Sequence, residues 1–139
     1  MGADARAFLD RWHRIVAERD VEGLREVLAE DVSMGAPPYW QRLSGRPLVH
    51  HLLGIILETI EGFRYEREWV AERDLALEFR GRVGELELQG VDLIALDDAG
   101  RIARLEVPMR PLNAVEALRG QVAPRMAEWL RRQAAGEGE

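Results

Sequence analysis

Asp92 is the residue whose type and setting point most directly to chemistry. It interrupts the apolar segment 91–96, and strand alternation places it on the same inward face as Leu86, Leu88 and Ile94. Keeping its carboxyl group neutral there raises the pKa from about 3.9 by roughly three units, which costs about 4 kcal/mol. Asp92 is therefore the candidate catalytic residue, as an acid, a base or a hydrogen-bond donor. The alternative is a structural carboxyl group that an indole or tyrosine hydroxyl satisfies, with no ligand.

Five further side chains are candidate ligand contacts around that carboxyl group. Trp12 lies in the apolar stripe of the first predicted helix, where it lines a pocket or packs in the core. Tyr39 and Trp40 lie on the proline-containing loop 35–40, where they rim a pocket or anchor the loop. Phe63 and Met109 lie on predicted strands. We expect them to pack on the face of the sheet, and the alternative is that they line the pocket.

The histidines do not form a predicted metal site. His50 and His51 are adjacent on a predicted helix, so their side chains point about 100° apart, and both fall on its polar arc. His13 lies at the edge of the first helix's apolar stripe and is expected to face solvent. The sequence contains no cysteine, and no set of His, Asp and Glu shows the spacing of a zinc or calcium site. We expect neither a metal nor another cofactor.

The spacing of hydrophobic residues distinguishes the helices from the strands that would position these side chains. The helical period predicts helices over residues 4–18, 21–29 and 47–60, and two more over 113–119 and 125–133, separated near Gly120 and Pro124. The alternating period predicts strands over 31–34, 63–73, 75–82, 85–96 and 102–109, with Pro108 marking a bulge or an edge. The order predicts an α+β fold: one domain over residues 1–133 and a disordered tail over 134–139.

Composition limits the classes of partner. The 139 residues, 47% of them hydrophobic, are enough for one domain with a substantial core. The 19 basic and 25 acidic residues give a net charge of −6, which argues against nucleic acid and membrane partners. The first ten residues lack the apolar run of a secretory signal, and the apolar stretch 52–57 is too short to span a bilayer. We therefore expect a cytoplasmic protein.

Three segments together resemble the nuclear transport factor 2-like superfamily, and within it the SnoaL-like and ketosteroid isomerase-like proteins. Residues 11–31 are similar to the opening helical hairpin, with its link Asp20-Val21-Glu22-Gly23, and residues 91–102 to the central β-hairpin. Residues 110–112 are similar to the ending of SnoaL-like members. The resemblance implies a cone-shaped fold, in which a curved antiparallel sheet wraps around helices. It also implies a deep apolar pocket and a homodimer formed through the convex face, where Val91, Leu93 and Ala95 would lie.

The resemblance carries over only part of the catalytic set of the ketosteroid isomerases. Their general base, a carboxylate before the first proline of the loop, matches Ala36, and the phenol of their oxyanion hole matches Trp12. Their second oxyanion donor, a protonated aspartate, matches Asp92. The resemblance leaves open whether another carboxylate, such as Glu106, replaces the base. Epoxide hydrolysis is not expected, because the arginine it needs matches Gly90 and residues 106–110 contain no aspartate.

Three functions remain open on this basis. The first is a protein that binds a small apolar, carbonyl-bearing molecule, with Asp92 acting in a cofactor-independent isomerisation or cyclisation. The second is a ligand-binding protein without turnover, and the third is a structural dimer whose cone is filled by side chains. An open cavity that reaches Asp92 would favour the first two over the third.

Overall fold

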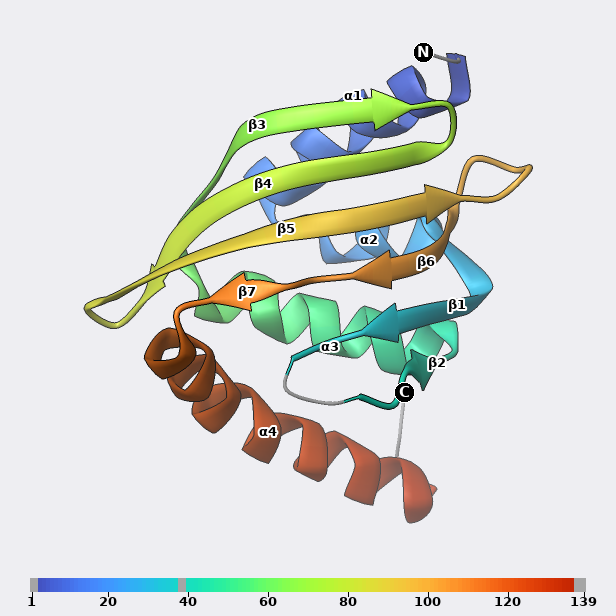
Figure 1. Cartoon of the computed structure of the whole chain (residues 1–139). Helices are drawn as coiled ribbons and strands as arrows, with labels where there is room; N and C mark the ends of the chain where they lie inside the picture. Colours follow the sequence, from blue (N-terminus) through green and yellow to red (C-terminus); the bar gives the residue numbers. More distant parts are fainter. Residues whose placement is uncertain (1–2, 38–39, 137–139) are drawn as a thin grey trace.

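The computed structural model describes residues 3–37 and 40–136, which fold as four helices against a strongly curved sheet (Figure 1). None of the helices in these ranges is both long and apolar enough to cross a membrane. The helices are α1 (Ala3–Glu18), α2 (Val21–Glu26), α3 (Arg46–Thr59) and α4 (Leu112–Ala134). The strands are β1 (Leu28–Gly35), β2 (Leu43–Ser44), β3 (Glu61–Ala71), β4 (Asp74–Val83), β5 (Leu86–Leu96), β6 (Ile102–Glu106) and β7 (Met109–Arg110).

The sheet is mixed rather than wholly antiparallel. Its strand order is β2-β1-β6-β5-β4-β3, and β7 pairs with β5. Strands β3 to β6 form the predicted antiparallel meander, but β1 pairs with β6 in parallel, which corrects the expected all-antiparallel arrangement. Pro108 separates β6 from β7, as its missing N–H predicts, and its carbonyl accepts a hydrogen bond from the Val91 N–H at 3.1 Å.

The opening helical hairpin has a physical reason for its Asp-x-x-Gly link. Asp20 caps α2, because its Oδ1 accepts a hydrogen bond from the Gly23 N–H at 3.0 Å. A Cβ atom at Gly23 would lie 2.5 Å from Asp20 Oδ2 and 3.2 Å from Ile15. Glycine at this position therefore lets the cap form while α2 packs closely against α1, which turns the apolar stripe of α1 toward the sheet.

Strand β3 departs from simple alternation. Tyr65 pairs with Phe79 and Glu68 pairs with Leu77, so three steps along β3 match two along β4. Such a bulge changes which face later residues occupy. Trp69, expected to alternate in step with Tyr65, instead lies on the outer face of the sheet and is 51% exposed.

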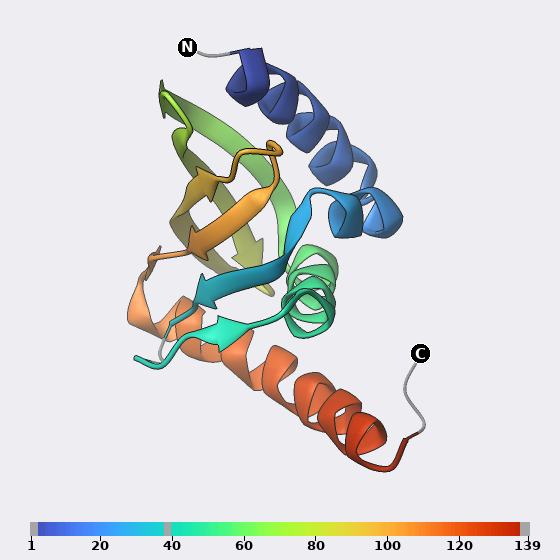
Figure 2. The ribbon, with the colours of Figure 1, turned by 90° about the vertical axis from the view of Figure 1, so that its right-hand side faces the viewer.

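Helix α4 is continuous, although two separate helices were predicted over this region. Gly120 and Pro124 lie inside it, and the buried side chains of its first half, including Leu118 and Val122, pack under the sheet. This packing offsets the hydrogen bond that Pro124 cannot make. Figure 2 shows α1 and α3 on one side of the sheet, with α4 running across the open end. Of the predicted tail, 134–136 are described and 137–139 lie outside the described residues.

Candidate functional site

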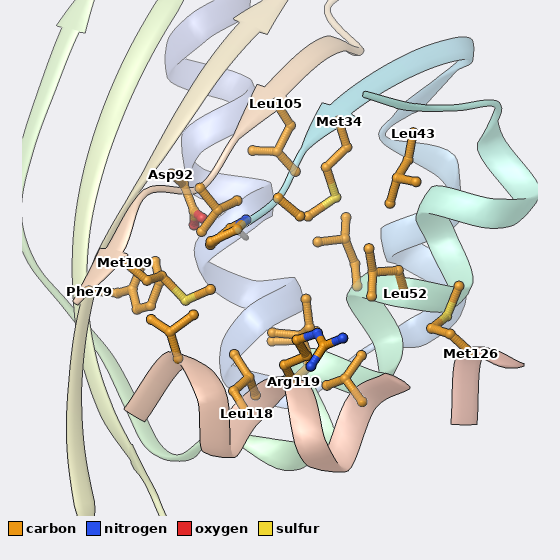
Figure 3. A pocket seen from close by; sticks show the side chains of 18 of the residues that line it. Met34, Leu43, Leu52, Phe79, Asp92, Leu105, Met109, Leu118, Arg119 and Met126 are labelled. Atoms are coloured by element: carbon orange, nitrogen blue, oxygen red, sulfur yellow. The ribbon is translucent and has the colours of Figure 1, made fainter. Parts of the chain in front are cut away.

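A cavity of about 370 Å³ lies between the concave face of the sheet and the helices. Among its described lining residues, polar side-chain atoms come only from Trp12, Tyr65, Asp92 and Arg119. The remainder is aliphatic, aromatic or methionine, including Phe79, Leu105 and Met109 (Figure 3). The cone is therefore not filled by side chains, as a purely structural protein would require, and its cavity reaches Asp92.

Three side chains form a hydrogen-bond chain at the inner wall of this cavity. The Trp12 Nε1–H donates to the Tyr65 hydroxyl oxygen at 2.8 Å, and the Tyr65 hydroxyl donates to Asp92 Oδ2 at 2.6 Å. Helix α1 supplies the first residue, β3 the second and β5 the third. Tyr65 pairs with Phe79 on β4, and its side chain reaches across β4 to Asp92, which is only 7% exposed.

The direction of this chain is fixed by chemistry. An indole N–H can only donate, so the Tyr65 oxygen accepts from Trp12, and Asp92 Oδ2 is the acceptor that the described residues offer to the Tyr65 hydrogen. Oδ2 of Asp92 is then an acceptor whether or not the carboxyl group is protonated. When Asp92 is neutral, its proton therefore sits on Oδ1, which makes no hydrogen bond to the described residues, and Asp92 is one of the residues that line the cavity.

The electrostatics of the site favour the neutral acid more than those of an ordinary aspartate. Burial raises the pKa of Asp92 to about 7, and the hydrogen bond from Tyr65 partly opposes that rise. Burial, followed by the neighbouring charge of Asp92, raises the pKa of Tyr65 well above its usual value, so the phenol keeps its proton. Asp92 is thus a group that can give or take a proton near neutral pH.

Stacked aromatic rings fix the shape of the wall beside Asp92. Phe63 and Phe79 stack with ring centroids 4.8 Å apart, and Phe63 meets Tyr65 edge to face at 5.1 Å. Gly90, two residues before Asp92 on the same face, leaves the room that the Phe79 ring needs: a Cβ there would lie 2.4 Å from Phe79 Cζ. The position that matches the epoxide hydrolase arginine thus has no room for such a side chain.

The predicted contacts separate into three groups. Asp92, Trp12, Phe63 and Met109 all line the cavity, and their roles in ligand binding stay predictions. Trp40 does not belong to the lining, and its side chain is 97% exposed, which corrects the expectation that it rims the pocket. Tyr39 lies outside the described residues.

Two polar cavity residues are absent from the set predicted from the sequence. Tyr65 is not among the predicted site residues, although a tyrosine hydroxyl is one of the predicted partners of Asp92. Its position two residues from Phe63 was the available signal for an inward face. Arg119 was missed because two short helices, rather than one continuous α4, were predicted around it. No sequence signal showed that this arginine borders the apolar face of a long helix.

The remaining ionisable candidates lie elsewhere. Glu106 pairs with Arg104 at 3.1 Å and lines a groove on the outer face, so it does not replace the missing base at Ala36. His13 pairs with Glu68 at 2.6 Å instead of facing solvent alone, and His51 stacks on Trp129. No group of three or more metal-ligating side chains occurs in the described part of the chain.

Comparison with known proteins identifies relatives by structure. No protein-family profile and no curated protein sequence matches the chain. A steroid delta-isomerase from Pseudomonas aeruginosa is 38% identical, with a TM-score of 0.88 over 94% of this chain and 97% of that one. An uncharacterized protein with a cystatin-like fold from Silicibacter pomeroyi DSS-3 is 37% identical, with a TM-score of 0.85 over 94% and 93% of the two chains.

A more distant neighbour shows the breadth of the fold. A nuclear transport factor 2-like protein of unknown function from Mesorhizobium loti is 21% identical, with a TM-score of 0.68 over 78% of this chain and 92% of that one. The α+β cone predicted from the sequence is confirmed by these likenesses and by the curved sheet itself. The chain thus belongs to the ketosteroid isomerase-like family of the two relatives that are 38% and 37% identical to it, and it has the nuclear transport factor 2-like fold.

Proposed function

We propose that the protein binds a small apolar molecule through its carbonyl group, which accepts a hydrogen bond from the protonated Oδ1 of Asp92. The observation that carries the proposal is the hydrogen-bond chain from Trp12 through Tyr65, which leaves Oδ1 to bear the acid proton beside an apolar cavity. A cavity of about 370 Å³ falls in the range of small-molecule sites, roughly 300–1,000 Å³. The apolar walls provide affinity, and Asp92 sets the orientation.

The neutral carboxyl group of Asp92 favours a ligand that has a hydrogen-bond acceptor over a ligand that has none. A buried donor that loses its partner leaves its proton unsatisfied, so a hydrocarbon of the same shape should bind less well than the ketone. Ionised Asp92 has no proton to donate, and its charge opposes the partial negative charge of a carbonyl oxygen. Binding of a ketone should therefore weaken as the pH rises through about 7.

The test compares a saturated steroid monoketone with the same steroid hydrocarbon by isothermal titration calorimetry. For the ketone we expect roughly a tenfold loss of affinity between about pH 5.5 and about pH 8, because about a tenth of Asp92 stays neutral at the higher pH. Asp92→Asn keeps an N–H donor in place of the acid proton at every pH. Its affinity for the ketone should therefore be independent of pH.

His13 provides the matched control, because its ring centroid lies 5.9 Å from that of Tyr65 while its side chain pairs with Glu68 rather than with Asp92. In His13→Gln the pH dependence should persist with its midpoint unchanged. A dependence that disappears in His13→Gln but persists in Asp92→Asn would contradict the proposal. Equal binding of ketone and hydrocarbon at low pH would contradict it as well.

Isomerisation is a second candidate function, favoured by the pKa of about 7 at Asp92. A carboxylate of that strength can take a proton from the carbon next to a carbonyl group and return it to another carbon, with no net consumption of protons and no cofactor. The relative named as a steroid delta-isomerase makes a β,γ-unsaturated steroid ketone the first probe. Turnover moves the double bond into conjugation with the carbonyl group, which increases ultraviolet absorption.

Asp92→Asn separates the two functions. If the protein is an isomerase, this variant should lose turnover of the unsaturated ketone while retaining its binding. Absence of turnover in the unmodified protein, together with pH-dependent binding, would support the non-catalytic ligand-binding alternative. An unchanged rate in Asp92→Asn would remove Asp92 from the reaction.

A further inference from the structure

The cavity has a second polar feature that the proposed function does not use. Of the lining residues that the structure describes, Arg119 is the one with a permanent positive charge. It comes from α4, whereas Asp92 comes from β5, and Figure 3 shows the two on opposite sides of the cavity. The lining between them is apolar, with Phe79, Met109 and Leu118 as examples.

The position of Arg119 on α4 places it at the entrance of the cavity rather than in its interior. Val115, Leu118 and Val122 are buried and face the cavity, and Arg119 lies one turn after Val115 and next to Leu118. It is nevertheless an exposed residue. Its side chain therefore borders the apolar stripe of the helix, with contact to both the cavity and solvent.

An arginine at this entrance has a chemical preference. Its planar guanidinium group carries five N–H donors in a fork that matches the two oxygens of a carboxylate, so a bond made elsewhere still leaves donors for a ligand. The chain as a whole has a net charge of −6, which repels anions. A positive group beside an apolar cavity is thus a local exception to the charge of the molecule.

We infer that Arg119 binds an acidic group of the ligand, so that the natural ligand is an apolar keto acid with its carbonyl group at Asp92 and its carboxylate at the entrance. This inference rests on the proposed function and adds the class of ligand and its orientation. The reverse orientation would bring the carboxylate next to Asp92, an acidic group in an apolar wall with no cation beside it. The aliphatic residues between the two ends would accommodate the carbon skeleton.

Arginine could also serve here only through its methylene groups, which cover apolar surface while the charged end stays in water. Arg119→Met distinguishes the two roles, because methionine retains a long apolar side chain and loses the charge. Arg125→Gln is the matched control: it removes a positive charge from the same helix, at a residue that pairs with Glu58 at 2.8 Å and is outside the cavity lining.

The experiment measures dissociation constants by calorimetry for unbranched methyl-ketone acids of increasing chain length, each beside its methyl ester. At about pH 6 the acid group is ionised and Asp92 is mostly neutral. At the chain length that spans the cavity, we expect the acid to bind about fivefold more tightly than its ester. Added salt should reduce this preference.

Arg119→Met should remove the preference for the acid over its ester, while Arg125→Gln should preserve it. Esters that bind as tightly as acids at every chain length would overturn the inference, as would an equal effect of the two variants. Either result would leave the proposed function standing if ester binding still weakens above about pH 7. Binding of neither acids nor esters would overturn both.

Discussion

At the scale of single residues, two opposing effects set the acid strength of Asp92. Removal from water disfavours its charge, and the Tyr65 hydroxyl favours it. Burial is the larger effect, so the folded protein holds the proton of Asp92 more tightly than the unfolded chain does. Stability must therefore depend on the pH with a sign opposite to that of an aspartate in a salt bridge.

Asp92→Asn should accordingly change stability in a pH-dependent way. The contribution of Asp92 to stability is fully present below about pH 4 and is lost as the pH rises toward about 7, because only the unfolded chain readily loses the proton. The asparagine side chain cannot ionise, so the variant does not lose this stability. Its free energy of unfolding should equal that of the wild type in acid and exceed it at pH 8 by at most about 4 kcal/mol. Urea unfolding at the two pH values measures the difference.

Glu78 provides a control, because its contribution to stability depends on pH in the opposite direction to that of Asp92. The hydrogen bond from Arg67 is the main cause that lowers the pKa of Glu78 to about 2, so Glu78 contributes stability above its ordinary pKa and loses it as the pH falls toward 2. Glu78→Gln should therefore destabilise the protein at neutral pH. If Asp92→Asn also destabilised the protein at pH 8, the assignment of Asp92 as a buried acid would be wrong.

Tyr65→Phe tests the hydrogen-bond chain itself. The change removes the donor to Asp92 and leaves the buried indole N–H of Trp12 without its acceptor, which should cost about 1–3 kcal/mol. The pKa of Asp92 should rise further, because the effect that opposes burial is gone. Carbon NMR of the labelled carboxyl group measures this pKa directly.

Trp12→Phe is the matched comparison for that variant. It leaves the bond from Tyr65 to Asp92 in place, so the pKa of Asp92 should move less than in Tyr65→Phe. The same pKa in wild type and Tyr65→Phe would show that this hydrogen bond does not influence the carboxyl group.

The sequence could predict Asp92 but not its partner, for a physical reason. Alternation along one strand shows which face a residue occupies, and it placed Asp92 inward correctly. The contact with Tyr65 joins β3 to β5 across β4, and beside it the Phe79 ring needs the room that Gly90 leaves. The bulge after Tyr65 moved Trp69 to the outer face. Bulges arise from pairing between strands, which a single strand's pattern does not contain.

At the scale of elements, the meander and the helical hairpin could be predicted because each depends on local periodicity and short turns. The parallel pairing of β1 with β6 could not, because it joins segments about 70 positions apart with no local signal. The continuity of α4 was missed for a related reason. Glycine and proline disfavour a helix locally, and the packing of Leu118 and Val122 under the sheet outweighs that preference.

Gly90→Ala tests how closely β4 and β5 pack beside the cavity. The new Cβ would meet Phe79 at 2.4 Å and Met109 at 2.8 Å, so we expect a loss of about 1–3 kcal/mol in urea unfolding. Gly54→Ala in α3 is the control: among the described residues, no atom outside the neighbouring backbone of α3 lies within 4 Å of its Cβ position, and alanine should stabilise the helix by up to about 1 kcal/mol. Equal effects of the two changes would contradict the close-packing argument.

At the scale of the whole molecule, the outer face of the sheet is the surface on which we expect a second copy to dock. Trp69 and Leu93 are 51% and 42% exposed, and they line one groove on this face together with Ala95. Exposed apolar side chains that share a groove are typical of interfaces. A two-fold axis would let each copy bury the same groove against the other.

Leu93→Glu should convert the expected dimer to a monomer at micromolar concentration, because two carboxylates would be buried near the axis. Sedimentation velocity reports the change. Leu112→Glu, at a residue that is 73% exposed and outside this groove, should leave the dimer intact. A monomeric wild-type protein at that concentration would contradict the docking of a second copy.

The hydrogen-bond chain has a spectroscopic consequence for the molecule as a whole. The protein has four tryptophans, and Trp12 is the buried one whose indole N–H binds the Tyr65 hydroxyl, whereas Trp40 and Trp69 are exposed. Hydrogen bonds in a chain polarise one another, so a charge on Asp92 makes the Tyr65 oxygen a stronger acceptor. The protein thus contains its own reporter, one indole proton whose resonance frequency follows the charge of a carboxyl group two hydrogen bonds away.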